Sequence, residues 1–312
     1  MDIVYILKNA IETGFIWSLL ALGVFISYRV LDFADLTVEG SLTFGGAISA
    51  ALLLQTNIPF LSNPIVTIIF SIAGGMLAGL ITGILHTKFQ IPGILAGIIS
   101  MTGLYSINLL VMGGASLYIS NTTTVYQPIE NLLVNTFNME NMQWVKFLTK
   151  SLTSLGMVVF ACSTIYWFFG TEIGMSIRAT GCNQHMARAQ GINTHKMIII
   201  GLAISNGLVA LAGALYVHCY KSSNMDLGRG SIVVGLASII IGEVLIGKVT
   251  FKRWLFAVII GSILFQAIIG IAILLGFSAN NLKLLQAILI TFILAFPIIK
   301  KWIVKKRGGR YA

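Results

Sequence analysis

The sequence alternates between long apolar runs and short polar connections. A helix that crosses a membrane needs about 20 consecutive, mainly apolar residues, and most of the runs have that length. They predict an all-α polytopic membrane protein with about nine transmembrane helices, within a range of roughly eight to ten. The expected spans are 5–28, 41–56, 64–86, 92–112, 151–170, 198–218, 231–247, 254–276 and 283–300. The second and the seventh of these are short.

Each short run follows a similar polar segment. Residues 35–41 read Asp-Leu-Thr-Val-Glu-Gly-Ser, and residues 226–231 read Asp-Leu-Gly-Arg-Gly-Ser. Five predicted crossings separate the two segments, so they point in opposite directions across the membrane. We therefore expect an inverted repeat of two halves, approximately 5–170 and 198–300, joined by the connection 171–197. Together they form a single transmembrane domain over residues 1–312.

Paired short segments of this kind mark the transport pathway in proteins built from inverted repeats. A helix that begins inside the membrane exposes unpaired backbone N–H groups, which are tolerated only beside a cavity or in the protein interior. The alternative is that Asp35 and Asp226 only cap the helices that follow them. The residues expected along the solute pathway are Asp35, Glu39, Gly40, Ser41, Asp226, Gly230 and Ser231.

The composition agrees with a membrane protein. Hydrophobic residues make up 57% of the chain and charged residues 10%, and the mean hydropathy is +0.92. An ordinary soluble domain has roughly 25% charged residues. The net charge of +10 would suggest nucleic acid as the partner of a soluble protein. Here the basic residues lie between and after the apolar runs, so they indicate orientation in a bilayer and no nucleic-acid binding.

The distribution of Lys and Arg predicts which side of the membrane each loop faces. With 171–197 placed inside the cell, fourteen of the 20 Lys and Arg residues fall on the cytoplasmic side and six outside. Cytoplasmic loops carry the excess of basic residues. The C-terminus is therefore expected in the cytoplasm, and nine crossings place the N-terminus outside. The first apolar run is expected to be a permanent helix, because it lacks the features of a cleaved signal peptide.

Glycines repeat at every fourth position in two of the expected spans. Gly75, Gly79 and Gly83 form one series, and Gly93 and Gly97 form another. This spacing places them on one face of a helix and lets a neighbouring backbone approach closely. Packing between helices of one chain is favoured over a dedicated dimer face.

The connection 171–197 is polar and lies between two strong spans. Within it, residues 183–189 form a candidate short helix, with Asn183 able to cap its start and Gly191 to end it. Small residues and polar anchors suit such a helix for insertion into the groove of a partner protein. Composition alone would equally describe a solvated loop.

This segment resembles the coupling loop of permeases of bacterial ABC importers, whose pattern is Glu-Ala-Ala, three residues, then Gly. Ala187 and Gly191 fit the last Ala and the Gly, while His185 and Met186 replace the Glu and the first Ala. That departure is usual in the branched-chain amino acid and ribose permease superfamily, which the chain resembles over nearly its whole length. The run 31–54, LDFADLTVEGSLTFGGAISAALLL, is similar to a subgroup described as tryptophan/tyrosine transport permeases.

The resemblance implies a permease subunit that moves a small polar solute, an amino acid and within this subgroup an aromatic one, into the cell. It also implies two cytoplasmic ATPase subunits, an extracytoplasmic solute-binding protein, and location in the bacterial cytoplasmic membrane. The pore would be a permease homodimer or a pseudo-dimer of two different permease chains. ATP hydrolysis would belong to the partner, and no cofactor, metal or catalytic residue is expected. The residues expected to contact the ATPase are Asn183, His185, Met186, Ala187, Arg188, Ala189, Gln190, Gly191 and Ile192.

Other kinds of chemistry find little support in the sequence. The run 242–248 resembles a Walker A motif, but Val249 stands where Ser or Thr is required. Three cysteines and four histidines lack the spacing of a metal site or a disulfide framework. An ion-coupled secondary transporter remains the alternative function. Its ion site would have to use the two acidic residues well inside apolar runs, Glu12 and Glu243.

Overall fold

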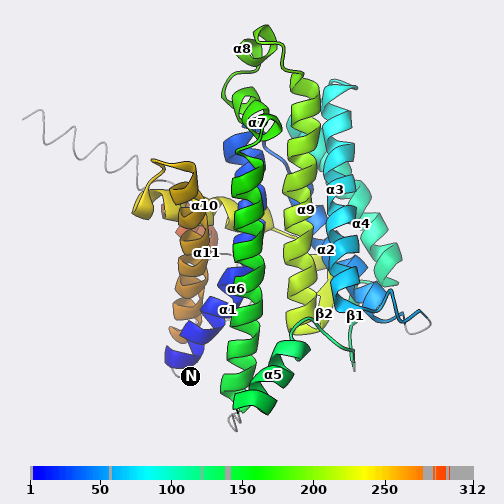
Figure 1. Ribbon diagram of the computed structural model, residues 1–312, viewed down its shortest axis with the longest axis vertical. Coiled ribbons are helices and arrows are strands. Elements are labelled where there is room, and N and C mark those ends of the chain that lie inside the picture. The colour runs from blue at the N-terminus through cyan, green and yellow to red at the C-terminus, as the bar shows by residue number, and fades with distance from the viewer. Residues whose placement is uncertain are drawn as a thin grey trace, which may run out of the picture.

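The protein is a bundle of long helices (Figure 1). The computed structural model describes residues 3–55, 58–120, 122–137 and 142–276, with short pieces between 284 and 295. Within this part of the chain, seven helices are long and apolar enough to cross a membrane, and α2 is a shorter apolar helix. The all-α polytopic class is therefore confirmed. The count of about nine stays a prediction, because the expected span 283–300 falls mostly outside the described residues.

The helices follow the apolar runs closely. Helix α1 continues into a π-helical turn, η1, and two very short strands, β1 and β2, pair in antiparallel fashion across the chain. The bounds are α1 Ile3–Phe25, η1 Ile26–Val30, α2 Thr37–Leu53, α3 Pro64–Thr87, α4 Gly93–Met112, β1 Ser116–Tyr118, α5 Gln127–Phe137, α6 Met142–Phe168, α7 Glu172–Cys182, α8 Gln184–Ala189, α9 Thr194–Tyr220, β2 Ser222–Asn224, η2 Met225–Leu227, α10 Ser231–Ile246 and α11 Phe251–Leu274.

Helix α9 is the central element of the bundle. Most of its side chains are buried, and α1, α2 and α3 pack around it. The glycine series of α3 faces it: a Cβ on Gly75 or Gly79 would collide with the α9 backbone at Asn206 or Leu202. Gly83 likewise faces Ile199. The regular glycine spacing thus serves close packing between two helices of one chain, as predicted.

Helix α2 begins deep in the bundle. The chain leaves η1, passes through irregular backbone at residues 31–36, and enters α2 at Thr37. Asp35, just before this helix, bonds to Asn206, which lies near the middle of α9. Helix α2 therefore begins about halfway along α9. The polar segment 35–41 is therefore mostly helical, because the Asp35 carboxylate accepts the Thr37 N–H at 2.9 Å and the helix begins there.

Helix α10 also begins after irregular backbone. It follows β2 and the 3₁₀ turn η2, and its first residue is Ser231. The end of α2 packs against residues beside β2, since Leu53 contacts the same buried cluster as Ile119 and Val217. Helix α2 therefore leads toward the strands and α10 leads away from them (Figure 1). A pseudo-twofold relation between the two halves stays a prediction.

Candidate transport site

A cavity of about 270 Å³ lies where the starts of α2 and α10 meet. Its walls come from the first turns of α2, from the middle of α4, and from the irregular segment before α10. One acidic and one basic side chain line it, together with hydroxyls, an amide and two methionines. The lining residues are Glu39, Gly40, Thr43, Met101, Thr102, Tyr105, Asn108, Met225, Gly228 and Arg229.

Glu39 connects the two repeated segments directly. Its carboxylate accepts the backbone N–H of Gly230 at 3.0 Å, the residue that precedes α10. Gly228 packs so closely on the Glu39 carbonyl oxygen that a Cβ there would collide with it. Gly230 has φ +80°, a conformation that favours glycine. The geometry requires both glycines and lets the second segment cross the first turn of α2.

A buried polar cluster holds the start of α2 against α9. The Asn206 side chain donates to Asp35 Oδ2 at 2.6 Å and accepts from Ser41 Oγ at 2.6 Å. Nearby, the Thr37 and Thr82 hydroxyls lie 2.7 Å apart, which ties α2 to α3. These groups are buried between helices, so they position the wall of the cavity without lining it.

The structure brings some of the predicted pathway residues together and separates others. Glu39 and Gly40 line the cavity, and Gly230 bonds to Glu39. Asp226 is exposed and pairs with Arg229 at 2.8 Å. Ser41 and Ser231 are buried, and Ser41 faces Asn206.

Helix α4 contributes a polar face to the cavity that was not predicted from the sequence. Thr102, Tyr105 and Asn108 recur at every third position in an apolar span, and all three line the cavity. That spacing places them on one face of a helix and could have marked it as polar.

Helices α7 and α8 form the upper end of the molecule in Figure 1. The Asn183 side chain accepts the Met186 N–H at 3.1 Å and caps α8, and Gly191 follows the helix with φ +82°. Both features match the predicted short helix. Ala187 is buried beneath it, and Arg188 Nε donates to Thr194 Oγ1 at 2.8 Å, so α8 is anchored to the start of α9. The remaining α8 side chains are exposed.

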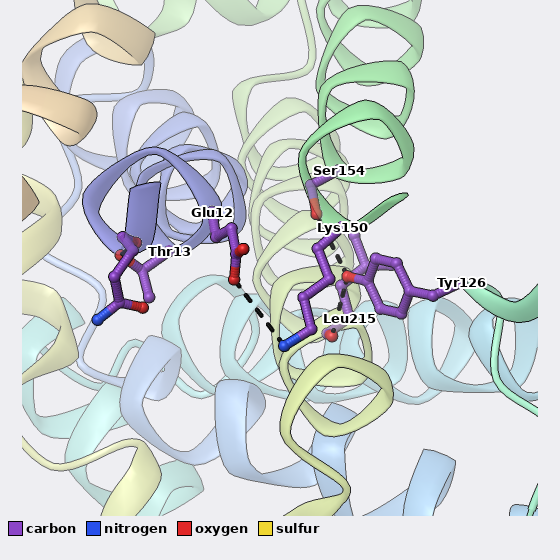
Figure 2. A network of polar contacts seen from close by, with 7 residues as sticks. Glu12, Thr13, Tyr126, Lys150, Ser154 and Leu215 are labelled. Atoms are coloured by element: carbon purple, nitrogen blue, oxygen red, sulfur yellow. Dashed lines mark hydrogen bonds and ion pairs between the residues drawn. The ribbon is translucent and has the colours of Figure 1, made fainter. Parts of the chain in front are cut away.

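The opposite end carries a polar network that joins α1, α6 and α9 (Figure 2). Lys150 Nζ lies 3.9 Å from Glu12 Oε2. The Tyr126 hydroxyl lies 3.2 Å from Ser154 Oγ and donates to the Leu215 carbonyl at 3.5 Å. Burial raises the pKa of the Tyr126 phenol, so it stays protonated. Because Glu12 pairs with Lys150, its carboxylate serves a contact between α1 and α6.

Glu243, the other acidic residue within a span, is likewise paired. It accepts from Arg29 at 2.6 Å and from Trp254 Nε1 at 2.9 Å, which joins α10 to η1 and α11. Among the described residues, no group of three or more His, Cys, Asp or Glu side chains could hold a metal ion.

The sequence matches a known family of membrane transport proteins. Residues 6–294 match the family described as the permease component of the branched-chain amino acid transport system. The chain belongs to this permease family. The permease is 38% identical to a tyrosine transport system permease protein of Clostridioides difficile, over 92% of this chain and 90% of that one.

More distant relatives of the permease have other solutes in their names. A ribose import permease protein of Escherichia coli is 25% identical over 80% of this chain and 70% of its own. A guanosine ABC transporter permease protein of Bacillus subtilis is 27% identical over 64% of this chain and 56% of its own. No solved structure matches the permease significantly. The permease is thus the multi-pass membrane component of an ABC-type transport system.

Proposed function

We propose that the permease imports an amino acid with an aromatic side chain, driven by ATP hydrolysis in a separate subunit. The observation that carries this proposal is the similarity to the tyrosine transport system permease, which extends over 92% of the chain. The cavity supports it, because an acidic and a basic group stand beside apolar and aromatic side chains in a space for one small solute.

The coupling to ATP is assigned to α7 and α8. Helix α8 projects exposed side chains from the end of the bundle while its buried Ala187 and the Arg188–Thr194 bond hold it to α9. A partner that moves α8 therefore also moves the central helix. The proposed assembly has two copies of the permease, two ATPase subunits docked on residues 183–192, and an extracytoplasmic solute-binding protein. The end that carries α8 faces the cytoplasm.

The proposed route for the solute passes the meeting point of α2 and α10. Glu39, Gly40 and Gly230 lie at this point, with Asp226 beside it. Asp35, Ser41 and Ser231 support the two helix starts from within the bundle. Because both helices begin near the middle of the membrane, small shifts of either would open the cavity toward one side.

Transport by the complete assembly tests this function. The permease would be purified with its partner ATPase and solute-binding protein, and placed in vesicles with ATP inside. We expect uptake of radiolabelled L-tyrosine that needs ATP and stops when the partner's Walker A lysine is replaced. Uptake that follows an imposed ion gradient without ATP would instead establish a secondary transporter. ATP-dependent uptake of another solute, with none of any amino acid, would reject the substrate.

A further inference from the structure

The cavity between α2 and α4 has an uneven distribution of hydrogen-bonding groups. On one wall stand acceptors: the half-buried Glu39 carboxylate and the Asn108 side chain, which is 1% exposed. Asn108 Nδ2 donates to the Gly40 carbonyl at 3.4 Å, while its Oδ1 has no hydrogen-bond partner within the described part of the chain. A buried amide oxygen without a partner is destabilising. This wall can therefore accept hydrogen bonds from a donor brought by the solute.

The other wall carries a cation. The Arg229 side chain is 59% exposed, lines the cavity, and immediately precedes Gly230, whose N–H bonds to Glu39. Its Nη1 pairs with Asp226 at 2.8 Å. A guanidinium has five N–H donors, so this pairing leaves donors for a second carboxylate. The positive Arg229 and the negative Glu39 thus line the same cavity, and the residue after Arg229 bonds to Glu39.

Between these walls lies an apolar and aromatic surface. Met101 and Tyr105 come from one face of α4, both line the cavity, and Tyr105 is 45% exposed. Methionine sulfur and an aromatic face both make favourable contacts with a ring. At about 270 Å³, the space lies just below the roughly 300–1,000 Å³ of typical ligand pockets, so it suits a single small molecule.

We propose that this cavity is a binding site of the permease itself for a zwitterionic α-amino acid. Glu39 and Asn108 receive the ammonium group, Arg229 receives the carboxylate, and Tyr105 and Met101 contact the side chain. The proposal rests on the proposed function for its substrate class. It adds that the permease recognises both charged ends of its solute, in addition to any selection by the binding protein.

Direct binding tests the site without the binding protein. The permease–ATPase complex in lipid nanodiscs would be incubated with radiolabelled L-tyrosine, with tyramine and 3-(4-hydroxyphenyl)propionate as competitors. Tyramine lacks the carboxylate, and the propionate lacks the ammonium group. We expect L-tyrosine to bind at least about tenfold more tightly than either analogue, since each loses hydrogen bonds to a charged group.

Two charge-removing variants assign each end of the solute. Glu39→Gln keeps an oxygen for the Gly230 N–H, so the two segments stay joined, and it should abolish only the preference over the propionate. Arg229→Gln should abolish only the preference over tyramine, and Arg229→Lys should restore part of it. Glu130→Gln, on α5 away from the cavity, is the matched control and should bind like the wild type.

Two outcomes overturn the site. One is a wild-type complex that binds no L-tyrosine, and the other is a pair of variants that keep both wild-type preferences. ATP-dependent tyrosine uptake together with either outcome would leave the proposed function intact and remove the site. Failure of uptake in the complete assembly would reject the function independently.

Discussion

At the scale of single residues, Asn206 joins the start of α2 to the centre of the bundle. It bonds to Asp35 and Ser41, which precede it by 171 and 165 positions. All three side chains are buried, so each relies on the others to satisfy its polar atoms. An isolated polar residue in an apolar run gives no sign of which distant residue it meets. The sequence therefore marked Asp35 and Ser41 as important but could not find Asn206.

Replacing Asp35 and Asn206, singly and together, tests whether their two side chains stabilise the protein jointly. Asn206→Leu should lower stability by about 1–3 kcal/mol for each buried group left without a partner. Asp35→Leu should also be destabilising, because it removes the acceptor of the Thr37 N–H at the start of α2. The double variant should lose less stability than the sum of the two, since neither partner is left unpaired. Thermal unfolding in one detergent measures all four proteins.

A distant pair provides the comparison. Asn206→Leu combined with Ile65→Ala, in the exposed first turn of α3, should show additive losses, because Ile65 lies about 15 Å along α3 from Gly75, which meets Asn206. Equal additivity for the Asp35 pair would mean that the two side chains contribute separately.

At the scale of elements, glycine positions decide how closely α3 approaches α9. Gly79→Leu should prevent packing, because the new side chain would collide with the Leu202 carbonyl oxygen. Gly103→Leu, on α4, has nothing within 4 Å of its Cβ and is the matched control. We expect the first variant to lose the monodisperse peak in size-exclusion chromatography and the second to keep it. A folded Gly79→Leu protein would show that α3 can move away from α9 without cost.

The turn after α8 is tested by its backbone conformation. Gly191 has φ +82° and open space around it, so a side chain would strain the backbone without meeting any described neighbour. Gly191→Val should insert in the membrane yet uncouple ATPase activity from transport. Gly191→Asn should retain more coupling, since asparagine tolerates this conformation. Full transport by the valine variant would exclude a role for this turn in coupling.

The presence and approximate position of most long helices could be predicted from the apolar runs, whereas the exact helix ends and the two strands could not. Helix α6 begins at Met142 instead of 151, because Trp144 and Phe147 extend its apolar character into a polar stretch. The strands β1 and β2 have three residues each, and the helices α5 to α9 separate them in sequence. No local alternation is long enough to announce them. The cavity was half predicted: the α2 and α10 starts were recognised, but the contributing face of α4 was not.

At the scale of the whole molecule, orientation remains the main prediction. The six Lys and Arg residues from Lys300 onward lie outside the described residues. Each is worth about 1 kcal/mol beside an anionic membrane surface, which favours the cytoplasmic side. In a variant with its three cysteines changed to serine, Ala312→Cys should resist an impermeant maleimide in intact cells. Phe60→Cys, exposed between α2 and α3, should react.

The reverse labelling pattern would invert the orientation. It would also move α8 to the outer surface, away from any ATPase. If the reagent crossed the membrane, it would label both cysteines, and this result would differ from either orientation.

The hydrogen bonds between α2 and Asn206 can form only late in synthesis of the chain. A ribosome adds about 5–20 residues per second, so Asn206 emerges roughly 10–30 s after Asp35. During that interval a newly made α2 has a carboxyl and a hydroxyl without their final partner, and at 17 residues it is short for independent insertion. The first helices must therefore be sheltered by the insertion machinery until α9 arrives. A nascent chain that stops before α9 leaves an incomplete bundle for the membrane proteases to remove.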